Sequence, residues 1–338
     1  MLPSGDGLSR RSQSSLEGRY ASVSYATVNL TRGNSRPMAI ANILSCRSGA
    51  EGVGSVGIIR GGTQMHILHQ PKPRLIAAAL LCLIFPCVVR AADETTLTKE
   101  QIKNFLLTAK VVKSDRSGKG ITHPWRLTLT DGTVTHDASF QSIDEHQAMK
   151  QLASGTEIGF VDSYKYNIAA YRLAELLGLD DMLPVYVERK WQGNPGSISW
   201  YLPVKMDEEE RRRKNLKAPD LDAWNNQMYR VRVFDQLVDD TDANLTNVLI
   251  GEDWKIWRVD FTRAFRSQKD LKDPQANLVR CDRQLLEKLK TLDGKELAEK
   301  TKHYLDKDDV KAVMARRDKI VEHFQKLVAE KGENAVLY

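Results

Sequence analysis

The sequence predicts a two-lobed α+β fold, in which a small β-rich lobe with one helix precedes a mostly helical lobe. Two observations support this prediction. Strand-forming segments separated by turn residues are concentrated before residue 205, whereas segments with helical spacing of apolar residues dominate after residue 206. The length of 338 residues also fits about two ordinary domains.

The first 64 residues differ in composition from the rest of the chain. Residues 1–64 are rich in Ser, Gly and Arg, hold 10 of the 21 glycines, and show neither a helical period nor strand-like alternation. We interpret them as disordered, or as upstream sequence assigned from the wrong start.

Residues 65–91 have the features of a signal peptide. Lys72 and Arg74 form a basic region before an apolar run of 15 residues, and Ala91 ends a small-residue cleavage pattern. The run is shorter than the roughly 20 residues that a spanning helix needs. We predict cleavage after Ala91 or Ala92 and a periplasmic or secreted protein without a stable membrane span. An uncleaved N-terminal membrane anchor is the alternative.

Charge and cysteine content restrict the possible partners and the means of stabilisation. The net charge of +6 lies wholly in residues 1–91, which carry ten Lys and Arg against three Asp and Glu. The remainder has no excess of positive charge, so we expect no nucleic-acid partner. After residue 91 the single cysteine, Cys281, cannot form an internal disulfide.

The predicted N-lobe covers residues 92–205. Its expected elements are a helix near residues 98–107, a hairpin over residues 125–140, a helix over residues 162–178, and a hairpin from VYVERKW to SISWYLP. Asp131-Gly132 marks the first hairpin turn, because these residues tolerate positive φ. Asp162 or Ser163 can cap the second helix, and Gly178 can end it.

The predicted C-lobe covers residues 206–338. Residues 206–220 are so highly charged that we expect a solvated linker there. Apolar residues then recur at helical spacing on one long helix: Trp224, Met228, Val231, Phe234 and Leu237. Three further amphipathic helices are expected at residues 282–292, 294–305 and 308–331.

Residues 239–265 place acids and amides on either side of an apolar hairpin. Asp242 precedes Asn247 by five residues at the end of the long helix, and a second strand ends just before Asp260. A hairpin of this length brings Asn247 and Asp260 together. Carboxylate and amide oxygens suit Mg²⁺, and phosphoryl transfer requires a positioned nucleophile and a divalent metal.

The same segment resembles a known family. The pattern D-x-x-x-x-N, a short hairpin, and then an apolar residue followed by Asp-Phe resembles the catalytic and metal loops of the protein kinase-like superfamily. Asn247-Val248-Leu249-Ile250 and Val259-Asp260-Phe261 look most like the phosphatidylinositol 3-/4-kinase catalytic domain branch. The segment DSYKYNIAAYRLAELLGL also resembles uncharacterised exported bacterial proteins.

The resemblance implies residue roles and cofactors. Asp242 would be the catalytic base, and Asn247 and Asp260 would be ligands of Mg or Mn. The nucleotide would be ATP or another nucleoside triphosphate, with an unknown phosphoryl acceptor as the second substrate. The resemblance also implies further nucleotide-site candidates: Lys150 or Lys165 as the phosphate-contacting lysine, Glu175 as its partner, and Trp200 to Leu202 as the adenine-facing segment.

Two departures from the kinase pattern support an alternative function. No basic residue adjoins Asp242, and the strand segment THDASF lacks the lysine that kinases offer to the phosphates. The alternative is a catalytically inactive pseudokinase that acts as a binding or scaffold module. Arg263 and Arg266 could bind phosphate, or they could pair with surface carboxylates. The glycine-bearing stretch SDRSGKGITHP could cover a phosphate, or it could be a plain loop.

An interpretation without the resemblance concerns the acids at the end of the long helix. Asp239, Asp240 and Asp242 would then be solvated, and the tryptophan-bearing hairpin would be core. Carboxylates at a helix C-terminus oppose the helix dipole. The negative charge of this cluster therefore requires a compensating cation, which favours a metal-binding role for these residues.

Overall fold

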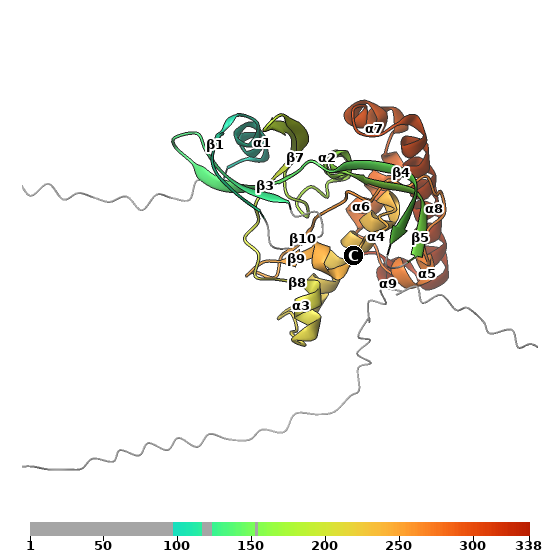
Figure 1. The fold of residues 1–338 in the computed structure, drawn as a ribbon. Coiled ribbons are helices and arrows are strands. Elements are labelled where there is room, and N and C mark those ends of the chain that lie inside the picture. Colours follow the sequence, from blue (N-terminus) through green and yellow to red (C-terminus); the bar gives the residue numbers. More distant parts are fainter. Residues whose placement is uncertain (1–96, 117–123, 153–154) are drawn as a thin grey trace, which may run out of the picture. The chain divides into compact units, whose positions relative to one another are not determined.

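The computed structural model describes residues 97–116, 124–152 and 155–338. Figure 1 shows a β-rich region followed by a mostly helical one, which confirms the predicted α+β fold class. The predicted leader, residues 1–91, lies outside the described residues, and so do residues 117–123 of the glycine-bearing stretch. Among the described helices, none combines the length and apolarity needed to cross a bilayer.

An antiparallel sheet of five strands forms the β-rich region, with the order β1-β2-β3-β7-β6. The strands are β1 (Lys110–Arg116), β2 (Trp125–Thr130), β3 (Thr135–Gln141), β6 (Tyr186–Trp191) and β7 (Asn194–Trp200). Both predicted hairpins are present. In the β2–β3 turn the Asp131 carboxylate accepts backbone N–H groups of Thr133 and Val134 at 2.9 and 2.8 Å, which fixes the turn.

Two helices lie on opposite faces of this sheet. On one face, Arg189 of β6 donates to the carbonyls of Leu106 and Ala109 at the end of α1 (Lys99–Thr108). On the other face, Asn167 of α2 (Tyr164–Leu177) donates to Ser197, the strand partner of Glu188. Side chains at 188 and 189 alternate across the sheet, so the two helices cover different faces.

Both helices were predicted, and the caps of α2 are the expected ones. Thr98 and Gln101 form a capping box at the start of α1. Ser163 caps α2, and Gly178 ends it with a left-handed φ of 68°.

A two-stranded ribbon, β4 (Asp144–Leu152) with β5 (Gly155–Ser163), precedes α2 and was not predicted. Most of its side chains are exposed, including the cross-strand partners Met149 and Ile158, with exposed fractions of 63% and 83%. Phe160, Asp162 and Ser163 at the end of β5 are buried. Too few of the ribbon's residues are buried for an apolar alternation to reveal the strands.

The helical region begins with β8 (Met206–Asp207) and α3 (Glu208–Arg213). Residues 213–217 are exposed, as the prediction of a solvated linker requires, whereas Glu208 is buried and accepts hydrogen bonds from Arg211 and Arg212. The long helix α4 (Leu221–Val238) buries its predicted apolar stripe. The later helices are α5 (Pro274–Asn277), α6 (Arg283–Thr291), α7 (Gly294–Thr301), α8 (Lys307–Lys331) and α9 (Glu333–Val336).

Candidate active site

The predicted hairpin consists of β9 (Val248–Ile250) and β10 (Ile256–Arg258). At its open end the Val259 N–H donates to the Asn247 carbonyl at 3.0 Å. This bond brings Asn247 beside the segment that contains Asp260. Asp260 adopts a left-handed φ of 61°, a conformation that a non-glycine residue keeps only when its surroundings enforce it.

Asp242 joins the same site through the loop after α4. Its N–H donates to the Asp240 carboxylate at 2.9 Å, and its carbonyl accepts from Asn247 Nδ2 at 3.2 Å. The preceding residue, Thr241, donates through both its N–H and its hydroxyl to the Arg263 carbonyl. The structure therefore gathers the three predicted residues into one hydrogen-bonded region, with the Asp242 side chain exposed.

Arg258 neutralises acids beneath this site. Its fully buried guanidinium donates to Asp235 at 3.0 Å and to the buried Asp240. The neighbouring Asp239 pairs with Lys272 at 2.8 Å. The cation that the acidic cluster requires is thus supplied by two basic side chains. The argument for a metal from that cluster was wrong, as was the prediction that Asp239 and Asp240 are solvated.

Electrostatics around Asp260 disfavour its charged form. Burial raises the pKa of this carboxyl to about 6, and the negative charges of Asp240 and Asp162 add to the increase. The Thr262 hydroxyl donates to Asp260 Oδ1 at 3.1 Å, and this hydrogen bond opposes the increase in the pKa of Asp260. Burial also raises the pKa of Asp162. The Thr262 hydroxyl thus interacts with both carboxyl groups.

A divalent cation at Asp260 would draw on the side-chain oxygens of Asp162 and Asn247. The buried Oδ1 of Asp162 has no hydrogen-bond donor among the described residues. Asn247 Nδ2 is used by the Asp242 carbonyl, so the Asn247 Oδ1 is the ligand atom that this amide would offer. No cluster of three His, Cys, Asp or Glu side chains with metal-binding geometry occurs in the described part of the chain. A cation here would need Asn247 and ligand oxygens to complete its shell.

The predicted lysine and glutamate pair does not form. Lys150 pairs with Glu145 on its own strand, and Lys165 pairs with Asp144, each at 2.7 Å. Glu175 instead binds Lys103 of α1 and Arg172. Lys165 and Glu175 lie ten residues apart on α2, which separates their Cα atoms by about 15 Å along the helix axis.

Two amides that the prediction missed connect α2 to the site. The fully buried Asn167 donates to Gln141 Oε1 at 2.7 Å and to Ser197 Oγ at 3.3 Å. Its Oδ1 accepts the N–H of Phe261 at 2.7 Å. One side chain therefore joins the end of β3 to the residue after Asp260.

Trp200 lies on the face of the sheet that α1 covers. Its ring stacks on His136 with centroids 3.5 Å apart and meets Phe105 of α1 edge-on. Gln141 projects to the opposite face, since it is three positions from Ala138, the strand partner of Trp200. The structure thus places Trp200 and the amides near Asp260 on different faces of the sheet. Leu202 is half-buried in the segment after β7.

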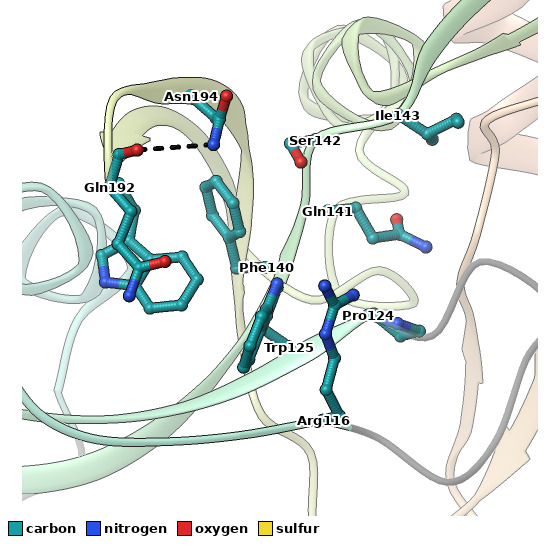
Figure 2. A pocket seen from close by; sticks show the side chains of 10 residues that line it. Arg116, Pro124, Trp125, Phe140, Gln141, Ser142, Ile143, Gln192 and Asn194 are labelled. Atoms are coloured by element: carbon teal, nitrogen blue, oxygen red, sulfur yellow. Dashed lines mark hydrogen bonds between the residues drawn. The ribbon is translucent and has the colours of Figure 1, made fainter.

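A pocket of about 320 Å³ lies at one end of the sheet. Figure 2 shows the side chains that line it. Its lining includes Arg116, Trp125, Phe140, Gln141, Trp191 and Asn194. The Arg116 guanidinium lies 3.9 Å from the centre of the Trp125 ring. None of the eight predicted site residues lines this pocket, which adjoins the site through Gln141.

Comparison with known proteins identifies the fold. No family model and no curated protein matches the chain. The structure of hydra Fam20 with sugar matches with a TM-score of 0.52 and 15% identity, covering 71% of this chain and 93% of that chain. The Golgi casein kinase matches with a TM-score of 0.51 and 15% identity, covering 71% and 79%. The chain has a kinase-like fold.

Proposed function

We propose that this protein is an exported phosphotransferase that moves a phosphoryl group from a nucleoside triphosphate, with Mg or Mn, to an acceptor. The observation that carries the proposal is the convergence of Asp242, Asn247 and Asp260 at the open end of the β9–β10 hairpin. The kinase-like fold supports it.

Each residue has a role that its surroundings allow. Asp242 is exposed at the end of its loop, where its carboxylate accepts the proton of an acceptor hydroxyl. Asn247 and Asp260 hold the divalent cation. When bound, that cation neutralises charge on the phosphate oxygens. Asn167 positions Asp260 by fixing the adjacent Phe261 N–H.

The sequence around the site supports a finer assignment. Within the kinase-like fold, we assign the chain to the phosphatidylinositol 3-/4-kinase branch and its exported bacterial relatives. The support is the pair of motifs Asn247-Val248-Leu249-Ile250 and Val259-Asp260-Phe261.

One observation favours the pseudokinase alternative. In protein kinases a strand lysine paired with a helix glutamate holds the nucleotide phosphates. At the contact between β3 and α2 this chain has the neutral pair Gln141 and Asn167. A protein that binds nucleotide without transferring phosphate would retain the metal residues and lack that ion pair.

Two variants of the full chain separate these functions. A phosphotransferase releases phosphate from MgATP or MnATP, Asp242→Asn binds nucleotide but loses turnover, and Asp260→Asn loses both. A pseudokinase shows no turnover in any variant. Absence of nucleotide binding by the wild-type chain with either metal contradicts phosphotransfer and favours the pseudokinase as a scaffold module.

A further inference from the structure

Two arginines of the loop after Asp260 converge on one glutamate. Arg263 Nη2 and Arg266 Nη2 donate to different carboxylate oxygens of Glu157 on β5. The three side chains are largely buried, with exposed fractions of 16%, 11% and 21%. Of the alternatives that the sequence left open, the structure shows a carboxylate pairing, in which a single carboxylate serves two guanidinium groups.

The arginines are held in place by the body of the protein. The Arg263 carbonyl accepts from Thr241, and the Arg266 carbonyl accepts from the buried Arg316 at 2.9 Å. The Phe160 ring, on the same ribbon as Glu157, lies 4.9 Å from the Arg263 guanidinium.

Arg263 has a donor that Glu157 does not use. Its buried Nε has no hydrogen-bond acceptor among the described residues. A buried donor without an acceptor costs free energy, about 1 to 3 kcal/mol. Each Glu157 oxygen accepts from one Nη2 atom, and the arrangement leaves Arg263 Nε without an acceptor among the described residues. A phosphate group carries three terminal oxygens, enough for Nε and both Nη2 atoms.

We propose that Arg263 and Arg266 form a subsite for a phosphate group carried by the phosphoryl acceptor, and that Glu157 fills it in the unliganded protein as a competing carboxylate. The inference rests on the proposed function. The location of Arg263 supports the proposal, because its backbone carbonyl accepts a hydrogen bond from Thr241, the residue before the base Asp242. Displacement of Glu157 would accompany acceptor binding.

The test measures binding of inorganic phosphate and of glycerol phosphate to the full chain by calorimetry. Glu157→Gln removes the competing charge while retaining a similar shape, so the dissociation constants for both probes should fall about tenfold. Adding Arg263→Gln to this variant should abolish the gain. Glu208→Gln is the matched control, because Glu208 also bridges two arginines, Arg211 and Arg212, and should leave phosphate affinity unchanged.

The proposal is overturned if Glu157→Gln binds phosphate no more tightly than wild type, or if the gain survives Arg263→Gln. If Glu157→Gln lowers the melting temperature without raising the affinity for phosphate, the role of Glu157 is to stabilise the fold. Tighter binding of free phosphate but not of glycerol phosphate would show that the subsite does not bind a phosphate group carried by an acceptor. MgATP binding, measured on the same proteins, separates the two proposals. If the chain binds phosphate through Arg263 but does not bind MgATP, the subsite is supported and the phosphotransferase function is rejected.

Discussion

At Asp260 the chain places a carboxylate where burial disfavours its charge. The group has a pKa of about 6 in the absence of a cation, well above its ordinary value. A carboxyl group must be deprotonated to bind a divalent cation. Protons and metal therefore compete for this side chain.

This competition predicts a pH dependence. Below pH 6 Asp260 is protonated and metal-dependent nucleotide binding weakens, whereas above pH 6 the carboxylate is free and binding strengthens. The affinity for MgATP should therefore rise from pH 5 to pH 7 with a midpoint near 6. Titration at each pH, with the exposed Glu252→Gln as control, checks this. A flat profile would show that Asp260 is not the titrating ligand.

Arg258 gives a prediction about stability. Arg258→Ala leaves Asp235 and Asp240 without their buried cation, so the free energy of unfolding should fall by about 3 to 5 kcal/mol. Denaturant unfolding measures this loss. Arg283→Ala removes an exposed pair with Glu333 and should cost at most about 1 kcal/mol. Equal effects of the two variants would contradict the role assigned to Arg258.

Among the elements, α2 is connected to the metal loop by Asn167. Asn167→Ala leaves the Phe261 N–H and the Gln141 amide without their partner, at about 1 to 3 kcal/mol for each unsatisfied group. We expect a lower free energy of unfolding together with weaker MgATP binding. Asn225→Ala, at a half-buried position of α4, should change neither quantity. Destabilisation with unchanged MgATP affinity would limit Asn167 to a structural role.

Elements with a local sequence signal were predicted, and elements without one were not. Periodic apolar residues predicted α4, and a short apolar hairpin between polar ends predicted β9 and β10. The ribbon of β4 and β5 was missed because few of its side chains are buried. The hydrogen bond between Gln141 and Asn167 was missed because no local sequence pattern links a residue at the end of a strand to a helix residue 26 positions later.

In the whole molecule, contacts between distant segments complete the site. Glu157 reaches Arg263 across 106 positions, and Arg258 reaches back 18 and 23 positions to its acids. Charge pattern alone suggested solvated acids and a metal, because the sequence does not show which basic side chain folds onto which carboxylate. The convergence of Asp242, Asn247 and Asp260 was predictable because these residues are close in sequence.

The leader gives a prediction for the whole molecule. Expressed in an exporting bacterial host, the chain should be recovered outside the cytoplasm with Ala92 or Asp93 as its first residue, since cleavage is expected after Ala91 or Ala92. N-terminal sequencing checks this. Recovery of the uncut chain in the membrane fraction would support the anchor, and uncut chain in the cytoplasm would contradict export.

The most direct test of the central claim is thermal unfolding of the full chain with MgATP or MnATP, comparing wild type with Asp260→Ala. Ligand at 100 times its dissociation constant stabilises the folded state by about 2.7 kcal/mol, which raises the melting temperature by several degrees. We predict a rise that requires both nucleotide and metal and is lost in Asp260→Ala. An unchanged wild-type melting temperature, or an equal rise in the variant, would contradict a nucleotide site built on Asp260.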